Sequence, residues 1–452
     1  MKAKLFLFAL NEFNRELLEN AANTWNLKNI KKILKFNYSQ SLTHDTYESD
    51  FLEPWVQWVS VQSGVESKLH GIKHLGDIPD LEVPQLWERL TENGVKCGIW
   101  GALNASLKKS QDAEFFVPDP WTFTQNAHPR KLQGFLDFPR YLAKNYLDFN
   151  IFTALKHLSS FSISLIKQPK ALLDCFRHVP LLFKGILKHP REIFVYFSFA
   201  EIILARAFFE ERKKKNIDFS MFFANGIAHL QHYDWLDTPL KSNFRLQYGF
   251  ECIDRILELA FQYQEEREDL IVMNALSQCN TNHEATWNSY KIQNPQDLFS
   301  LIGIKYQSIE PLMSYDGHIL FSNLTDANLA LRAFEEVKIN GENIFLVEKN
   351  PKDPLKIFYR SQFYAPLKEN ADFFIGNKAF KFFDYFKCLT TRTGKHIPTA
   401  DVFTTLNSLP KRIMNHEIYS IVCNFFGVEP LKMIASKDTS KEEVATRHDW
   451  LQ

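Results

Sequence analysis

Lys4-Leu-Phe-Leu-Phe-Ala-Leu10 is a short, almost entirely apolar run that stops at Asn11-Glu12. Such a run is typical of a parallel strand that is buried on both faces. It superficially resembles a signal peptide, but the apolar stretch spans only about seven residues and no small-residue cleavage site follows it. We therefore predict a buried first strand, followed by a helix near residues 15–22.

Further strand-like runs repeat this arrangement along the chain. Residues 96–102 follow a helical pattern at 85–93, and residues 269–273 follow another at 251–264. Strands that alternate with helices indicate an α/β fold with a doubly wound, mainly parallel sheet. Ligands of such sheets bind at the carboxyl ends of the strands. Polar residues at the predicted ends are Asn11, Asn104 and Asn274.

The charge is unevenly distributed. Lys+Arg and Asp+Glu both number 53, so the whole chain has no net attraction for polyanions. Residues 130–215, however, hold 16 Lys/Arg against 7 Asp/Glu. Prolines divide this Phe- and Leu-rich region into helix-length pieces at Pro139, Pro169, Pro180 and Pro190. We expect a core formed by residues 1–110 and 216–452, with a basic helical cap inserted at 111–215.

The composition argues against several classes of protein. The 6 cysteines are far apart, which disfavours a zinc ribbon or a disulfide framework and suits a reducing cytosol. There is no P-loop or dinucleotide fingerprint and no nucleic-acid-binding motif. We predict a cytoplasmic protein that binds no nucleic acid. Its basic cap is either an amphipathic face that contacts anionic membrane lipids or the solvated surface of a lid.

The most specific motif lies in residues 54–72. Trp58, Ser60, Ser63-Gly64 and His70-Gly71-Ile72 are spaced as in the nucleophile region of the alkaline-phosphatase superfamily. The segment resembles in particular the branch of type I phosphodiesterases and nucleotide pyrophosphatases. In that branch a nucleophilic Thr is followed by an aromatic-x-Ser/Thr step, then by Thr-Gly and His-Gly-Ile.

Other segments fall in the order that this resemblance requires. They are residues 5–11 for the first metal-binding strand, 223–229 for an Asp-x-x-x-His motif, 271–276 for a Ser-Asp-His strand and 394–396 for a late Gly-x-His. The resemblance covers about residues 4–105 and 217–427. It implies an alkaline-phosphatase-like fold that gathers Asn11, Pro54, Asn225, Asn274 and His396 into one pocket.

The chain departs from the superfamily at its reactive positions. The position of the nucleophile falls on Pro54, which cannot attack phosphorus. The acidic metal-binding positions read Asn11, Asn225 and Asn274, and one histidine position reads Leu276. Two divalent cations held close together need anionic ligands. The sequence therefore indicates a divergent member in which a two-metal site is doubtful.

A smaller site remains available to the chain. We predict that His229, His232 and His396 hold one divalent metal, Zn or Mn, with one coordination position open for catalysis. The alternative is that His229 and His232 are hydrogen-bonded pocket histidines. The predicted catalytic residues are Asn11, Glu12 and Glu53. Glu12 or Glu53 would be the base, unless the two are a helix-start carboxylate and a surface charge. The predicted substrate-binding residues are Trp58, Asn104, Asn225, Asn274 and Ser277.

The resemblance implies a phosphodiesterase- or phosphotransferase-like hydrolase. Its expected substrate is anionic and small or glycan-like, namely a nucleotide-sugar or a phosphorylated or sulfated glycan. Two alternatives stay open, both placed in surface polysaccharide biosynthesis. One is a catalytically inactive binding protein that keeps the pocket, and the other is a metal-independent transferase that uses Glu12 and Glu53.

Overall fold

The centre of the molecule is an eight-stranded sheet with the order β20-β2-β19-β6-β1-β5-β3-β4. The computed structural model describes residues 3–47, 50–109, 111–145, 150–190, 192–285, 287–313, 315–407 and 409–431. The strands are β1 (Lys4–Leu10), β2 (Asn37–Leu42), β3 (Cys97–Trp100), β4 (Phe115–Val117), β5 (Phe219–Ala224), β6 (Glu268–Met273), β19 (Thr399–Thr404) and β20 (Arg412–Met414). Only β19 runs antiparallel to its neighbours, β2 and β6. The predicted doubly wound, mainly parallel sheet is confirmed.

Strand β1 shows why the sheet is covered on both faces. It pairs in parallel with β5 on one side and β6 on the other. Phe6 and Phe8 pack into one large apolar cluster, whereas Leu5 and Leu7 pack into another. Successive side chains of a strand point to opposite faces, so a continuous apolar run needs a core on each side.

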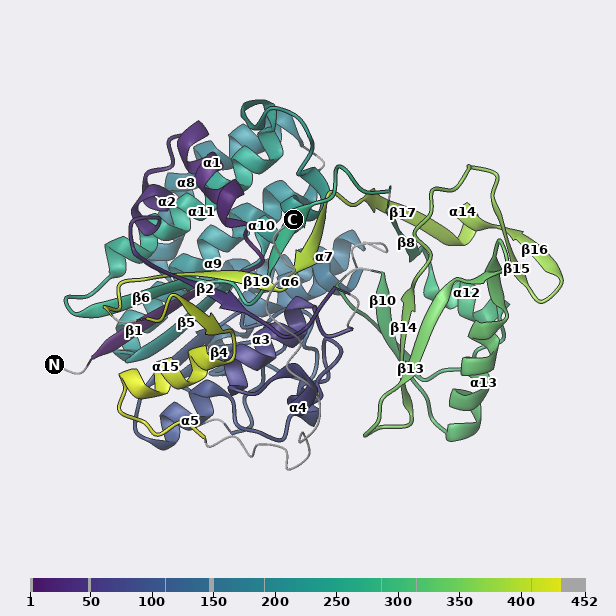
Figure 1. Ribbon diagram of the computed structural model, residues 1–452, viewed down its shortest axis with the longest axis horizontal. Helices are drawn as coiled ribbons and strands as arrows, with labels where there is room; N and C mark the ends of the chain where they lie inside the picture. The colour runs from purple at the N-terminus through teal and green to yellow at the C-terminus, as the bar shows by residue number, and fades with distance from the viewer. Residues whose placement is uncertain are drawn as a thin grey trace, which may run out of the picture.

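Helices form a layer over each face (Figure 1). One layer contains α1 (Arg15–Thr24), α2 (Lys28–Ile33), α9 (Ile193–Lys215), α10 (Gly226–Asp234) and α11 (Phe244–Tyr263). The other contains α3 (Pro54–Ser63), α5 (Leu86–Glu92) and α15 (Glu417–Phe425). Proline is favoured at the first position of a helix, and Pro54 starts α3 at the edge of the sheet.

The region expected to form the cap is helical, but its helices are longer than the prolines suggested. They are α6 (Gln133–Asn145), α7 (Ile151–Ile166), α8 (Pro169–Lys188) and α9. Pro139 and Pro180 lie inside α6 and α8 rather than between helices. Helix α9 belongs to the main core, because Phe208 and Phe209 pack against Phe6 of β1. Among the described residues, no helix is both long and apolar enough to cross a membrane.

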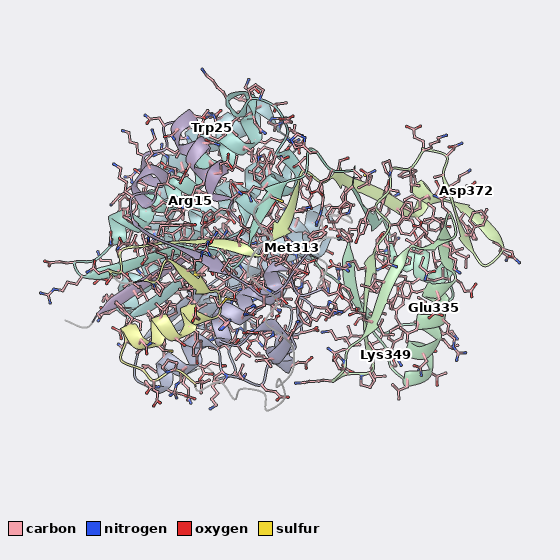
Figure 2. All side chains as sticks on the ribbon, viewed as in Figure 1. Arg15, Trp25, Met313, Glu335, Lys349 and Asp372 are labelled. Carbon is pink, nitrogen blue, oxygen red and sulfur yellow. The ribbon has the colours of Figure 1, made fainter. Side chains whose placement is uncertain are left out.

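Residues 288–391 form a second lobe, at the right of Figure 1. Its main sheet has the order β13-β14-β10-β9, from β9 (Ser308–Pro311), β10 (Asp316–Leu320), β13 (Phe345–Lys349) and β14 (Lys356–Ser361). Helices α12 (Pro295–Leu301) and α13 (Leu324–Glu335) pack on it around an apolar cluster of its own, which includes Phe299 and Phe334. Met313 lies where the two lobes meet (Figure 2).

Candidate functional site

Polar side chains from neighbouring strands meet at the carboxyl edge of the main sheet. Asn11 follows β1 and Asn225 follows β5, whose last residues are paired in register. The Asn11 Nδ2 donates to Asn225 Oδ1 at 2.7 Å and to Glu12 Oε1 at 2.7 Å. The indole Nε1 of Trp58 donates to Asn11 Oδ1 at 2.8 Å. The predicted meeting of strand ends is therefore found for these residues.

Glu12 is the centre of this arrangement. Its backbone lies in the left-handed region, with φ of 55°, which is uncommon for a residue with a side chain and points to a functional constraint. Its carboxylate is buried. Oε2 lies 3.0 Å from Nε2 of His232 and 3.0 Å from Nε2 of His396.

The two histidines come from different elements and are each held by a carbonyl. His232 lies on α10, and its Nδ1 is 3.0 Å from the carbonyl oxygen of Gly394. His396 lies on β18 (Gly394–Ile397), and its Nδ1 is 3.1 Å from the carbonyl oxygen of Leu52. Both nitrogens of each ring therefore face only oxygen acceptors.

The oxygen acceptors around the two rings favour a bound cation. A neutral imidazole has one N–H and one lone pair. One ring nitrogen of neutral His232 would therefore direct its lone pair at the lone pair of an acceptor oxygen, which is repulsive. A divalent metal removes this conflict because the ligand atoms of Glu12, His232 and His396 all lie within 4.8 Å of one another. Metal-binding histidines commonly donate their other N–H to a carbonyl, as both rings can here. The donor set fits one ion with an open position.

The charges of the three groups are strongly coupled. Burial opposes ionisation of Glu12, but the charges and hydrogen bonds of His396 and His232 outweigh it and hold its pKa well below the usual range. Burial would lower the pKa of His396, yet Glu12 and Glu53 raise it to about 9. For His232 burial dominates over the bond to Glu12, and its pKa is lowered. Glu12 is thus a carboxylate at neutral pH.

His229 lies one turn from His232 on α10 but outside this group. It lines the pocket beside this group, and its ring centroid lies 6.3 Å from that of Phe197 and 5.9 Å from that of Tyr233. Burial lowers its pKa to about 4, so the ring is neutral. Among the described residues, the histidine and carboxylate group able to hold a metal is Glu12, His232 and His396, with Glu12 in the place expected for His229.

Glu53 and Pro54 lie at the opposite side of His396. Glu53 Oε2 is 3.3 Å from His396 Nδ1, and Pro54 begins α3 directly after it. Burial would raise the pKa of Glu53, but the hydrogen bond and charge of His396 lower it. Glu53 is therefore an ionised carboxylate at the pocket wall, where the sequence analysis expected a base.

We call the hollow between the lobes the edge pocket. It is lined by Glu12, Glu53, Pro54, Trp55, Asn225, Ala228, His229, His232, Tyr233, Met313, Tyr315, Asp316, Arg360, Arg392 and His396. Predicted residues from the main core and unpredicted residues from the second lobe thus share one cavity.

Arg360 and Arg392 were not anticipated from the sequence. Arg360 lies on β14, with its guanidinium 3.9 Å from Glu53 Oε1, and Arg392 follows β17 (Phe386–Thr391). Arg392 lies over the ring of Trp287 at 4.6 Å and, among the described residues, has no carboxylate within 4.0 Å. Burial would lower its pKa, but nearby Tyr315 and other acidic groups raise it. The only sequence signal is its position four residues before His396.

Several residues predicted to bind substrate are instead committed to the protein backbone. Asn104 donates to the carbonyl oxygens of Trp55 and His74, and its Oδ1 accepts from Gly76 N. This side chain tethers loops and is not part of the edge-pocket lining.

Asn274 and Ser277 have a similar role. The Asn274 amide and the Ser277 hydroxyl each donate to the carbonyl oxygen of Phe13 at 2.7 Å. Asn274 Oδ1 also accepts from Asp401 N. Trp58 is fully buried and reaches the site only through Asn11, whereas Asn225 does line the pocket.

Comparisons with known proteins give low similarities. No protein-family model and no curated protein matches the chain. A human ectonucleotide pyrophosphatase/phosphodiesterase 5 structure is 9% identical, with a TM-score of 0.42 over 95% of this chain and 96% of that one. Phosphonoacetate hydrolase from Sinorhizobium meliloti 1021, in complex with phosphonoacetate, is 11% identical, with a TM-score of 0.43 over 94% and 96% of the two chains.

Proposed function

We propose that this chain is a phosphodiesterase-like hydrolase that uses one divalent cation in the edge pocket. The observation that carries the proposal is the contact set of His232 and His396. Each ring faces acceptors at both nitrogens, and each points Nε2 at the same Glu12 oxygen at 3.0 Å. A Glu-His-His set with an open position is characteristic of catalytic zinc.

The opposite wall of the pocket supports an anionic substrate. Arg360 and Arg392 bring two guanidinium groups to a cavity that also contains the metal-binding group. Guanidinium groups bind phosphate and related oxyanions through paired hydrogen bonds. Trp55 and Tyr315 offer apolar rings for a sugar or base. We propose a nucleotide-sugar or a phosphorylated or sulfated glycan as substrate.

The attacking group in this proposal is water. Among the described lining residues there is no Ser, Thr or Cys, and Pro54 occupies the place expected for a nucleophile. Burial raises the pKa of Tyr233 and of Tyr315, so both hydroxyls stay protonated. A bound divalent cation lowers the pKa of water and polarises a phosphoryl oxygen. The ionised carboxylate of Glu53 accepts the proton of the attacking water.

A catalytically inactive binding protein is the second candidate. The observation in its favour is that the neutral side chains of Asn11 and Asn225 are bonded to each other, and that the described residues offer one candidate metal group, not two. A metal-independent transferase has less support, because the Glu12 Oε2 needed as a base is already engaged by two histidines and by Gln278.

Metal content and turnover together test the proposal. We expect one Zn²⁺ or Mn²⁺ per purified chain, its loss in Glu12→Gln, and its retention in Glu53→Gln as the matched control. Glu53→Gln should lower turnover of bis(p-nitrophenyl) phosphate or a nucleoside diphosphate-sugar by roughly 10²–10⁴-fold. A wild-type chain without metal would overturn the proposal. One bound ion without turnover of phosphodiesters, sulfate esters or nucleotide-sugars would establish the binding protein.

A further inference from the structure

We propose that the outer face of α7 and α8 docks on the surface of an anionic lipid bilayer, with a lipid phosphate seated in the hollow between α8 and α11. The α7–α8 face consists of the exposed side chains Phe152, Leu155, Ile163, Ile166, Leu173, Phe176, Phe183 and Leu187. This inference is independent of the chemistry of the edge pocket.

The spacing on α8 makes a continuous apolar stripe. Leu173, Phe176, Pro180, Phe183 and Leu187 recur every three or four residues, the interval that places side chains on one face of a helix. Leu187 is 81% exposed and Phe176 is 66% exposed. The opposite side of α8 is the packed one, since Gly185 lies against Val195 and Tyr248. The helix therefore has an apolar face directed toward the core and another directed toward solvent.

Isolated exposed apolar residues are common, but a contiguous exposed set marks an interaction surface. Helix α7 also carries exposed apolar side chains, with Phe152 80% and Ile166 62% exposed. The break between the two helices is short, from Lys167 to Gln168. Two consecutive helices thus expose aromatic and aliphatic side chains to solvent.

The charges around this face identify the partner. Within residues 151–188 the cations are Lys156, Lys167, Lys170, Arg177, Lys184 and Lys188. The acidic residue of that range is Asp174, which is buried and lies 3.0 Å from Arg206. A surface with apolar side chains flanked by Lys and Arg suits the interface of an anionic bilayer. Two copies of the chain would instead bring like charges together.

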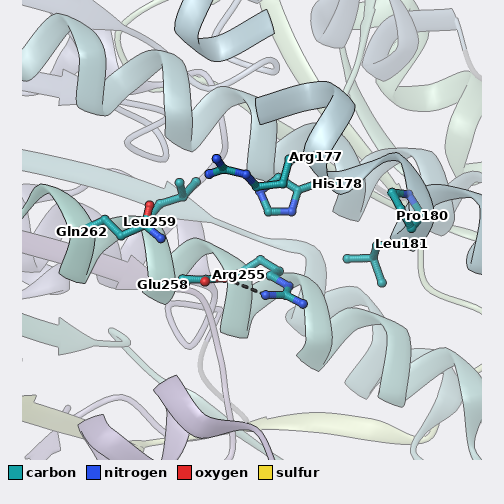
Figure 3. A pocket seen from close by; sticks show the side chains of 8 residues that line it. All are labelled: Arg177, His178, Pro180, Leu181, Arg255, Glu258, Leu259 and Gln262. Carbon is teal, nitrogen blue, oxygen red and sulfur yellow. Dashed lines mark hydrogen bonds and ion pairs between the residues drawn. The ribbon is translucent and has the colours of Figure 1, made fainter. Parts of the chain in front are cut away.

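A hollow of about 150 Å³ lies beside the stripe (Figure 3). It is lined by Arg177, His178, Pro180 and Leu181 of α8 and by Arg255, Glu258, Leu259 and Gln262 of α11. His178 is buried, and its Nε2 has no hydrogen-bond partner among the described residues. Arg177 and Arg255 stand beside it, each with a single carboxylate, at 3.3 and 2.7 Å. A phosphate would accept from His178 and from the two guanidinium groups.

Vesicle binding by the full chain tests the docking face. We expect sedimentation with vesicles of phosphatidylcholine and phosphatidylglycerol, and little with phosphatidylcholine alone. Phe176→Ser with Phe183→Ser should weaken binding at least tenfold. The matched control is Phe374→Ser, because this phenylalanine is 42% exposed but lies in the second lobe. Lys170→Glu with Lys188→Glu should weaken vesicle binding by about fivefold or more per lysine, and the binding should depend steeply on salt.

A second arm distinguishes a lipid phosphate from a free one. His178→Ala should weaken binding to the anionic vesicles. Inorganic phosphate at millimolar concentration should not displace the chain from these vesicles, because the inserted apolar side chains also hold it on the bilayer. If His178→Ala abolishes binding of inorganic phosphate but leaves vesicle affinity unchanged, the hollow binds free phosphate and not a lipid phosphate. Equal sedimentation of wild type and the double Phe variant would overturn the docking proposal. The proposal would also be overturned if the wild-type chain did not bind vesicles and instead formed a dimer that dissociates in the double Phe variant.

Discussion

The two halves of the sheet's carboxyl edge are built from similar positions but satisfy their polar groups differently. In one half, Asn11 and Asn225 bond to each other and Trp58 completes the set. In the other half, His232 and His396 both direct Nε2 to a single Glu12 oxygen. We call the first the amide half and the second the Glu12 half. Asn11 joins them through its bond to Glu12 Oε1, and the ligand atoms of the Glu12 half lie close enough together to hold a cation.

The two halves differ in the hydrogen-bonding groups that they contain. An amide group carries both donors and acceptors, so Asn11 can donate to Asn225 and Glu12 while it accepts from Trp58. A carboxylate between two imidazoles has no donor of its own, and its burial is tolerable only with neighbouring positive charge.

Metal removal should give the largest effect. Chelation of the wild-type chain should lower its free energy of unfolding by about 4 kcal/mol, the linkage expected when metal is present at a thousand times its dissociation constant. The loss falls on the Glu12 half, because the amide half holds no ion. Differential scanning calorimetry with and without chelator measures it. Glu12→Gln should show no response to chelator, and an equal response in both proteins would contradict the single-site assignment.

Asn11→Asp should destabilise the amide half and its bond to Glu12. The substitution replaces a donor by a negative oxygen that faces Glu12 Oε1 and Asn225 Oδ1, each 2.7 Å from the present Nδ2. We expect a loss of about 2–4 kcal/mol in the free energy of unfolding, measured by urea titration. Excess Zn²⁺ or Mn²⁺ should restore part of it, since adjacent carboxylates attract a cation.

The control for that substitution is Asn150→Asp. Asn150 is exposed and caps α7 by accepting from Thr153 N, a role that aspartate fills equally well. Its effect should stay within about 0.5 kcal/mol. If Asn11→Asp lowers the free energy of unfolding no more than this control does, the hydrogen bonds donated by Asn11 do not stabilise the fold.

Much of this edge was accessible from the sequence because strand ends carry the site. The apolar runs of β1, β3, β5 and β6 predict where the sheet lies, and residues that follow neighbouring parallel strands must meet. That reasoning named Asn11, Asn104 and Asn274, of which Asn11 lies at the site, whereas Asn225 and His396 were expected there only from the superfamily resemblance. It could not choose Glu12 over His229, because the left-handed backbone at Glu12 and the rotation of α10 arise only from tertiary packing.

The arginines were out of reach for a different reason. Arg360 lies on β14, where Tyr359 packs into the core of its own lobe and Phe358 packs into the apolar cluster of the main sheet. Nothing in the local spacing shows which edge of that lobe faces the main sheet. The second wall of the edge pocket is therefore a consequence of how the lobes meet, not of any single motif.

Glu201 provides a pH-dependent test of the amide half. Its Oε1 accepts from the backbone N–H of Asn225 and Gly226, at 2.6 and 3.0 Å, and burial raises its pKa to about 7 from 4.5. Because the folded pKa exceeds the unfolded one, its contribution is full below about pH 4.5. Stability is then lost as the pH rises to about 7, by roughly 3 kcal/mol.

Glu201→Gln mimics the protonated carboxyl group and should remove this dependence. We expect the difference in free energy of unfolding, variant minus wild type, to grow in favour of the variant from pH 5 to pH 8. Urea titrations at matched pH measure it, and other titrating groups cancel in the difference. A difference that is constant over this range would show that Glu201 is ionised throughout.

Trp58→Phe should give the smallest effect and confine it to the amide half. The change removes the indole N–H that donates to Asn11 Oδ1 and leaves that buried oxygen without a donor. We expect a cost of about 1–2 kcal/mol by urea titration, with the metal content unchanged because no ligand moves. Trp55→Phe is the matched control, because its indole bonds to Lys73 O at 3.1 Å from a partly exposed position. Loss of metal from Trp58→Phe, but not from Trp55→Phe, would mean that the two halves are coupled and that the amide pair positions Glu12 for its ion.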